Sequence, residues 1–334
     1  MLVALATVTT GLLTQRSAGG LQSSPPPIRV DTTRIGGYLG ELQASATRVW
    51  ALTCVQLCGA GDTGLDREQL VAVRASTGAV IRRLPLLNAI AFTIAGRSIW
   101  VAHFVSGEIT RIDPANGRIT ARIDLRLRKP IAGHDREFLP ASMSFADGYV
   151  WVSTARGWIA QIDARTARLV RMVRTPSEAN ATTTDRYGTW VAEDLDGVGL
   201  LTPGTRRLKL QAIEQAGWRA AIDAVISGGG LVWAVGSVDD TVNRSTVAIL
   251  DPRRDRVLHE VHTPAIAGAV YLDGALYLGD LAHGRIYRVS SSGSLSSLKT
   301  PRINAFLASS SPDTLWAATD ASPGRLLHVA LARG

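Results

Sequence analysis

Lysine, cysteine and aromatic residues are all scarce in this chain of 334 residues. Aromatic residues make up 6% and charged residues 19% of the sequence, and the usual charged share is about 25%. The only lysines are Lys129, Lys209 and Lys299, so arginine carries nearly all of the positive charge behind the net charge of +8. Base composition of a GC-rich genome explains such an arginine bias, and an anionic partner is the alternative.

The sequence also lacks the short motifs that mark the common enzyme classes. It contains no P-loop, no HExxH, no GxSxG and no strand–GxGxxG–helix unit. The two cysteines, Cys54 and Cys58, are too few for a zinc site, and no histidine cluster lies beside them. In an exported protein they can form a local disulfide, and two free thiols are the alternative. The arginines have no aromatic residues interleaved for base stacking, so we do not expect a nucleic-acid partner.

No apolar run at the start of the chain is long enough to cross a bilayer. Residues 1–13 resemble the apolar region of a signal peptide, but no basic segment precedes them and no clear cleavage site follows. Residues 22–27, QSSPPP, are typical of a stiff extended linker. We therefore expect an apolar segment and linker over 1–27, followed by a domain over 28–334. An extracytoplasmic location follows from this interpretation, either secreted or tethered to a membrane through the N-terminus.

The stretch 99–125, IWVAHFVSGEITRIDPANGRITARIDL, is the unit that the chain repeats. It reads as three short strands. In the last of them, apolar residues occupy every second position from Ile119 to Leu125, which predicts a half-buried strand with all of these residues on one face. Residues 113–117, DPANG, have the composition of a tight turn.

In most of the repeats an aromatic residue recurs in a short strand that follows a turn signal. Successive aromatics are separated by 39 to 51 residues, and a period of about 40–45 with several strands per repeat is typical of propeller blades. The seven residues are Trp50, Trp100, Trp151, Trp190, Trp233, Tyr277 and Trp316. They predict an all-β fold, a seven-bladed β-propeller with four strands in each blade.

The last predicted blade lacks an outer strand. After the stretch 314–319 and the stretch 325–331 the sequence supplies no further strand. Residues 28–35, IRVDTTRI, form a spare strand at the start of the chain. We expect this N-terminal strand to complete the last blade, because closure removes the open edge that the ring would otherwise present.

The unit WVAHFVSGEITRIDPANGRITARIDL resembles the bacterial YVTN-type propeller repeat, with its aromatic-Val-Ala strand, glycine turn, Ile-Asp turn and apolar outer strand. The likeness extends over about 28–332, and it implies a bacterial β-propeller. The chain is also similar, less specifically, to streptogramin-lyase-like propellers. Of their aromatic-Phe-Thr-Glu strand, only the stretch 190–193, WVAE, is a counterpart, and it lacks Phe-Thr. We therefore carry over no lyase active site.

Polar residues follow several of these aromatics by three positions, where the second strand of a blade reaches one face of the ring. His103, Glu193 and Asp280 occupy equivalent positions in blades two, four and six. His283 lies just beyond Asp280, and His134 lies in the long connection after blade two. If the ring brings them to one mouth, they can bind a ligand or a metal ion, or act as acid and base. The alternative is that they only face water at the ends of strands.

The combined pattern predicts a non-catalytic, monomeric propeller that binds a protein or a small-molecule ligand across this face. One alternative is a lyase-like or hydrolytic propeller enzyme that uses the mouth residues. Another is the sensor portion of a membrane-anchored signalling protein. The sequence assigns no catalytic residue, names no cofactor and does not identify the ligand.

Overall fold

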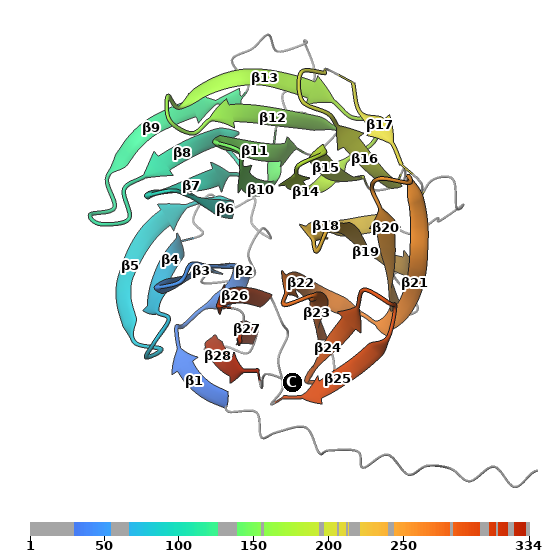
Figure 1. Ribbon diagram of the computed structural model, residues 1–334. Coiled ribbons are helices and arrows are strands. Elements are labelled where there is room, and N and C mark those ends of the chain that lie inside the picture. The colour runs from blue at the N-terminus through green and yellow to red at the C-terminus, as the bar shows by residue number, and fades with distance from the viewer. Residues whose placement is uncertain are drawn as a thin grey trace, which may run out of the picture.

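In the computed structural model the chain forms seven sheets, each of four antiparallel strands, arranged in a ring (Figure 1). The structure describes residues 30–54, 67–125, 139–154, 157–193, 197–205, 207–211, 213, 221–239, 244–280, 283–300, 307–311, 313–319 and 324–331. All of the elements within these ranges are strands. The predicted all-β fold of seven four-stranded blades is therefore confirmed.

The first three blades follow one another directly along the chain, and within each blade the strands are numbered from the centre of the ring outward. Blade 1 consists of β2 (Tyr38–Ala44), β3 (Arg48–Cys54), β4 (Arg67–Arg74) and β5 (Val80–Leu87). Blade 2 consists of β6 (Ala89–Ala95), β7 (Ser98–His103), β8 (Glu108–Ile112) and β9 (Ile119–Asp124). Blade 3 consists of β10 (Pro140–Ala146), β11 (Tyr149–Thr154), β12 (Trp158–Asp163) and β13 (Arg168–Arg174).

The next three blades repeat this order. Blade 4 consists of β14 (Ala179–Asp185), β15 (Gly188–Glu193), β16 (Gly197–Leu201) and the short β17 (Lys209–Leu210). Blade 5 consists of β18 (Ala221–Gly228), β19 (Leu231–Asp239), β20 (Arg244–Asp251) and β21 (Arg256–Pro264). Blade 6 consists of β22 (Ile266–Leu272), β23 (Ala275–Asp280), β24 (Arg285–Ser290) and β25 (Leu295–Lys299).

Blade 7 combines strands from both ends of the chain. Its inner strands are β26 (Leu307–Ser311), β27 (Thr314–Thr319) and β28 (Arg325–Ala330), and its outer strand is β1 (Val30–Arg34). The pairing of β1 with β28 runs from Val30 opposite Val329 to Arg34 opposite Arg325. The predicted closure of the ring by the N-terminal strand is confirmed.

The seven recurring aromatics hold the ring together. Each lies in the second strand of its blade and belongs to a separate buried apolar cluster at the boundary with the next blade. Trp100, for example, is fully buried against Met143, Val150 and Val152 of blade 3. Truncation of such a buried Trp to Ala typically costs about 3–5 kcal/mol. One aromatic at each boundary therefore explains the recurrence seen in the sequence.

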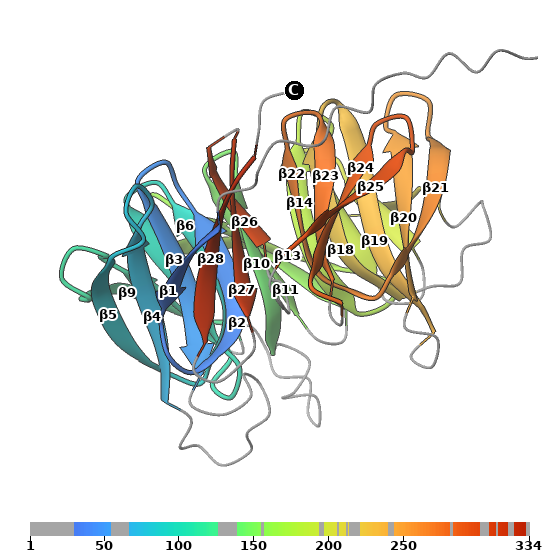
Figure 2. The same cartoon turned by 90° about the horizontal axis from the view of Figure 1, so that it is seen from below.

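The strands run between the two faces of the disc, which Figure 2 shows from the side. Since successive strands are antiparallel, the first-to-second turns of the blades and the third-to-fourth turns of blades 1 to 6 lie on one face, which we call the turn face. The second-to-third connections and the linkers between blades lie on the other, the loop face. The connections 55–66, 126–138 and 240–243 lie outside the described residues.

The prediction that the apolar residues of β9 share one face is wrong at Ile119. A β-bulge between Arg111 and Ile112 pairs Ile112 with Ile119 and Arg111 with Ala121, which leaves Thr120 as the extra residue. One additional residue reverses the side-chain alternation. Ile119 therefore faces blade 1, whereas Ile123 is buried on the opposite side, against blade 3.

In the part of the chain that the structure describes, no helix has the length and apolar character needed to cross a membrane.

Candidate functional site

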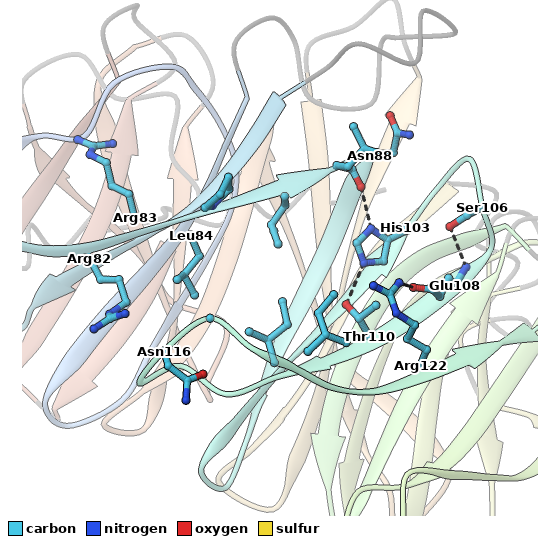
Figure 3. A pocket seen from close by; sticks show the side chains of 16 residues that line it. Arg82, Arg83, Leu84, Asn88, His103, Ser106, Glu108, Thr110, Asn116 and Arg122 are labelled. Atoms are coloured by element: carbon cyan, nitrogen blue, oxygen red, sulfur yellow. Dashed lines mark hydrogen bonds and ion pairs between the residues drawn. The ribbon is translucent and has the colours of Figure 1, made fainter.

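A groove of about 860 Å³ lies between blades 1 and 2 on the outer part of the ring (Figure 3). One wall is β5, and the other is formed by β8 and β9. Its floor continues the buried cluster between the two blades, and Leu84 and Ile112 belong to both. The bulge in β9 adds Ile119 to this surface.

The apolar surface of the groove is open to solvent. Ile119 is 38% exposed, whereas Leu84 in the floor is 6% exposed. Apolar side chains inside a concave, polar-rimmed surface are typical of binding sites. This exposure makes the groove the candidate functional site.

The charges of the groove are unevenly balanced. On the wall formed by blade 2, Arg122 forms an ion pair with Glu108. On the opposite wall Arg82 has no carboxylate partner among the described residues. Arg82 and Arg83 leave β5 in opposite directions (Figure 3), and Arg83 Nη1 donates to the Ile35 carbonyl at 2.7 Å instead. Arg82 therefore contributes an uncompensated positive charge.

His103 lies at the loop-face end of the groove, and both of its ring nitrogens have partners. Nδ1 is 2.7 Å from the Leu87 carbonyl and Nε2 is 2.9 Å from the Thr110 hydroxyl. Because a carbonyl oxygen only accepts, Nδ1 donates to Leu87. Both ring nitrogens of His103 are thus engaged by groups of the protein itself. His103 fixes the end of β5 to β7.

Glu193 is placed at the boundary between blades 3 and 4. Its side chain is fully buried, and its Oε2 accepts from the backbone N–H and the hydroxyl of Ser177, both at 3.4 Å. Ser177 lies in the linker that connects β13 to β14. Like His103, Glu193 therefore contacts the end of the preceding blade.

Asp280 and His283 lie together in blade 6. The Asp280 carboxylate is buried, with Oδ2 at 3.1 Å from His283 Nδ1 and at 3.5 Å from the Tyr287 hydroxyl, which donates to it. The His283 side chain is 62% exposed. Burial, and to a lesser extent the Asp280 charge, raises the pKa of Tyr287. Asp280 thus anchors its neighbours within the blade.

The structure does not bring the predicted mouth residues together. His103, Glu193 and Asp280 have separate partners in three parts of the ring, and both carboxylates are fully buried. No group of three or more potential metal ligands exists among the described residues. His134 lies outside the described residues, so its predicted role stays a prediction.

Cys54, at the end of β3, is disulfide-bonded. Its predicted partner Cys58 lies outside the described residues, so the pairing stays a prediction.

The groove has no recognisable pattern in the sequence. Arg82 and Arg122 are explained from the sequence as charges on exposed outer strands, which discourage edge-to-edge aggregation, or by an anionic partner. The groove depends on the β9 bulge, and nothing in the residue types around Thr120 marks a bulge. A second, smaller groove of about 480 Å³ lies between blades 3 and 4 and contains Val170, which is 48% exposed.

Comparison with solved structures supports the class of protein that this geometry defines, a seven-bladed β-propeller. The β-propeller domain of Cps50 (Swd1) from Myceliophteria thermophila is 12% identical, with a TM-score of 0.67 over 92% of this chain and 100% of that domain. A chain in the crystal structure of the mitotic checkpoint complex is 13% identical, with a TM-score of 0.67 over 100% of this chain and 99% of that chain. These similarities show the fold alone. No family model and no curated protein match the sequence, so the YVTN-type likeness stays a prediction.

Proposed function

We propose that this chain is a non-catalytic, extracytoplasmic propeller of the YVTN type that binds a protein partner through the groove between blades 1 and 2. The observation that carries this proposal is the exposed apolar surface of Ile119 inside a concave groove. The engaged ring nitrogens of His103 and the buried carboxylates of Glu193 and Asp280 support a structural role for these residues rather than a catalytic one.

The occupant that fits the groove is an extended segment of a partner protein with an acidic side chain among apolar ones. The groove runs beside the outer strands β5 and β9, and strands accommodate an extended chain along their length. An apolar side chain would cover Ile119, and a carboxylate would pair with Arg82. The mitotic checkpoint complex is by its name an assembly, and this agrees with a role in protein binding.

The proposed location outside the cytoplasm is supported by the disulfide at Cys54, because disulfides persist in oxidising compartments. The apolar residues 1–13 agree with export.

A peptide selection tests the proposed binding. Random decapeptides displayed on phage would be selected on the folded chain, and the enriched peptides synthesised and measured by fluorescence anisotropy. We expect enrichment of Asp or Glu beside Leu, Ile or Phe. Ile119→Ser and Arg82→Gln should each weaken binding by about tenfold, since one lost apolar contact or ion pair in a desolvated groove is worth on the order of 1.4 kcal/mol.

Val170→Ser is the matched control, because Val170 is also an exposed apolar residue on an outer strand, in the groove between blades 3 and 4. Peptides that bind Ile119→Ser and Val170→Ser equally well, with both variants folded by circular dichroism, would show that the groove between blades 1 and 2 is not the binding site.

A further inference from the structure

Three side chains meet on the turn face at the boundary between blades 4 and 5. Arg186 and Tyr187 form the turn between β14 and β15, and Arg253 lies in the turn between β20 and β21. Arg186 Nη2 is 2.9 Å and Arg253 Nε is 3.0 Å from the Tyr187 hydroxyl oxygen. Two guanidinium groups from different blades therefore donate to one hydroxyl oxygen.

Short local hydrogen bonds hold this arrangement. Asp185 Oδ1 accepts from the Tyr187 backbone N–H at 2.8 Å, and Asp251 Oδ1 accepts from the Arg253 backbone N–H at 2.9 Å. The Arg186 guanidinium also lies over the Tyr187 ring, 4.9 Å from its centroid. Such turns fix the backbone at both positions, so the two cations are positioned before any ligand arrives.

Arg186, Tyr187 and Arg253 together have more hydrogen-bond donors than the described residues around them have acceptors. Among the described residues, neither Arg186 nor Arg253 forms an ion pair, and the neighbouring Asp251 carboxylate pairs with Arg254 at 3.7 Å. The Tyr187 hydroxyl accepts two bonds and still has its own proton, for which no described residue is an acceptor. The hydrogen bond from Arg253, followed by that from Arg186, lowers the pKa of Tyr187. An anion at this position would satisfy all three donors.

We propose that Arg186, Tyr187 and Arg253 form a binding site for a phosphate or sulfate group that bridges blades 4 and 5. The planar guanidinium groups present paired N–H donors that match a tetrahedral oxyanion, and the tyrosine hydroxyl donates a third bond. Because the arginines are at the surface, a free inorganic anion would bind with a dissociation constant on the order of millimolar. The site is separate from the groove between blades 1 and 2.

Calorimetric titration with sodium sulfate and sodium phosphate, at an ionic strength held constant with chloride, tests the site. Arg253→Gln and Arg186→Gln should each weaken binding at least fivefold. The matched control is Arg165→Gln, because exposed Arg165 follows Asp163 in blade 3 as Arg253 follows Asp251 in blade 5. Vesicles of phosphatidylcholine with and without phosphatidic acid form a further arm, which distinguishes a lipid phosphate from a free one.

A spectroscopic readout separates this site from general attraction of anions to arginine. A bound anion neutralises the two guanidinium groups, so sulfate should raise the pKa of one tyrosine in the phenolate absorbance titration, and Tyr187→Phe should abolish that shift. Binding of either phosphate source with this dependence on Arg253 supports the proposal. Absence of binding to all three probes, or equal weakening in Arg165→Gln and Arg253→Gln, would overturn it.

Discussion

Single polar side chains tie neighbouring blades together near the centre of the ring. Glu41 Oε2 accepts from the Phe92 backbone N–H at 2.8 Å, and Gln43 Nε2 donates to the Phe92 carbonyl at 2.6 Å. Gln43 Oε1 accepts from the Ile94 N–H at 3.1 Å. These backbone groups of β6 face blade 1 rather than another strand, so the side chains satisfy them. Burial raises the pKa of Glu41 to about 7.

The raised pKa of Glu41 predicts a stability that depends on pH. The folded state binds the proton more tightly than the unfolded state, so the free energy of unfolding should fall as pH rises from about 4.5 to about 7 and then level off. Glu41→Gln should remove this contribution, which amounts to up to about 3 kcal/mol. Urea unfolding at several pH values measures it, with exposed Glu178→Gln as the control. If the free energy of unfolding changes with pH in the same way in the wild type and in Glu41→Gln, Glu41 is not the group with the raised pKa.

Among the elements, the outer strands differ most from their sequence pattern. The second strands were predictable because an aromatic such as Trp100 must recur at every blade boundary, and that leaves a regular signal. The bulge in β9 leaves no such signal, because exposed Ile119 is the same type of residue as buried Ile123. For His103 the position at a strand end was predictable, but its direction was not, because its partner Leu87 belongs to the preceding blade.

The turn between β8 and β9 provides a test of how tightly the groove is packed. Gly117 has a φ of +77°, and an added Cβ would lie 2.9 Å from Leu84 Cδ2 in the floor of the groove. Gly117→Ala should therefore cost about 1 kcal/mol for the backbone conformation and further free energy for displacing Leu84. Gly148→Ala is the control, because Gly148 has a φ of +82° with nothing within 4 Å of its Cβ position.

Thermal unfolding of the two glycine variants separates the cost of the backbone conformation from the cost of displacing Leu84. We expect Gly117→Ala to melt at a lower temperature than Gly148→Ala. Equal melting temperatures would mean that Leu84 moves at no cost and that the groove is loosely packed.

At the scale of the whole molecule, stability depends on closure of the ring. The backbone of the segment after β1 is also tied to blade 7, where the Ile35 N–H donates to the Gly324 carbonyl at 2.9 Å and the Gly324 N–H donates to the Gly37 carbonyl at 2.9 Å. Ile35 and Leu326 are both fully buried in the cluster between blades 7 and 1. The first strand is thus part of the core rather than an appendage.

Deletion of residues 28–35 should therefore destabilise the protein far more than deletion of residues 1–24. Loss of the pairing with β28 and of buried Ile35 should lower the melting temperature by on the order of 10 °C. Differential scanning calorimetry of both truncated chains makes the comparison. If the two deletions melt at the same temperature, β1 contributes nothing to stability and the closure argument fails.

The register between β1 and β28 has a mechanical consequence. Val30 lies opposite Val329 and Arg34 opposite Arg325, so the first residue of β1 and the last residues of β28 leave the blade at the same edge. A force that pulls the two ends of the domain apart would load these five residue pairs one after another, as in a zipper, rather than all at once. The ring would therefore open at blade 7 under a smaller force than a sheared pair of strands would resist.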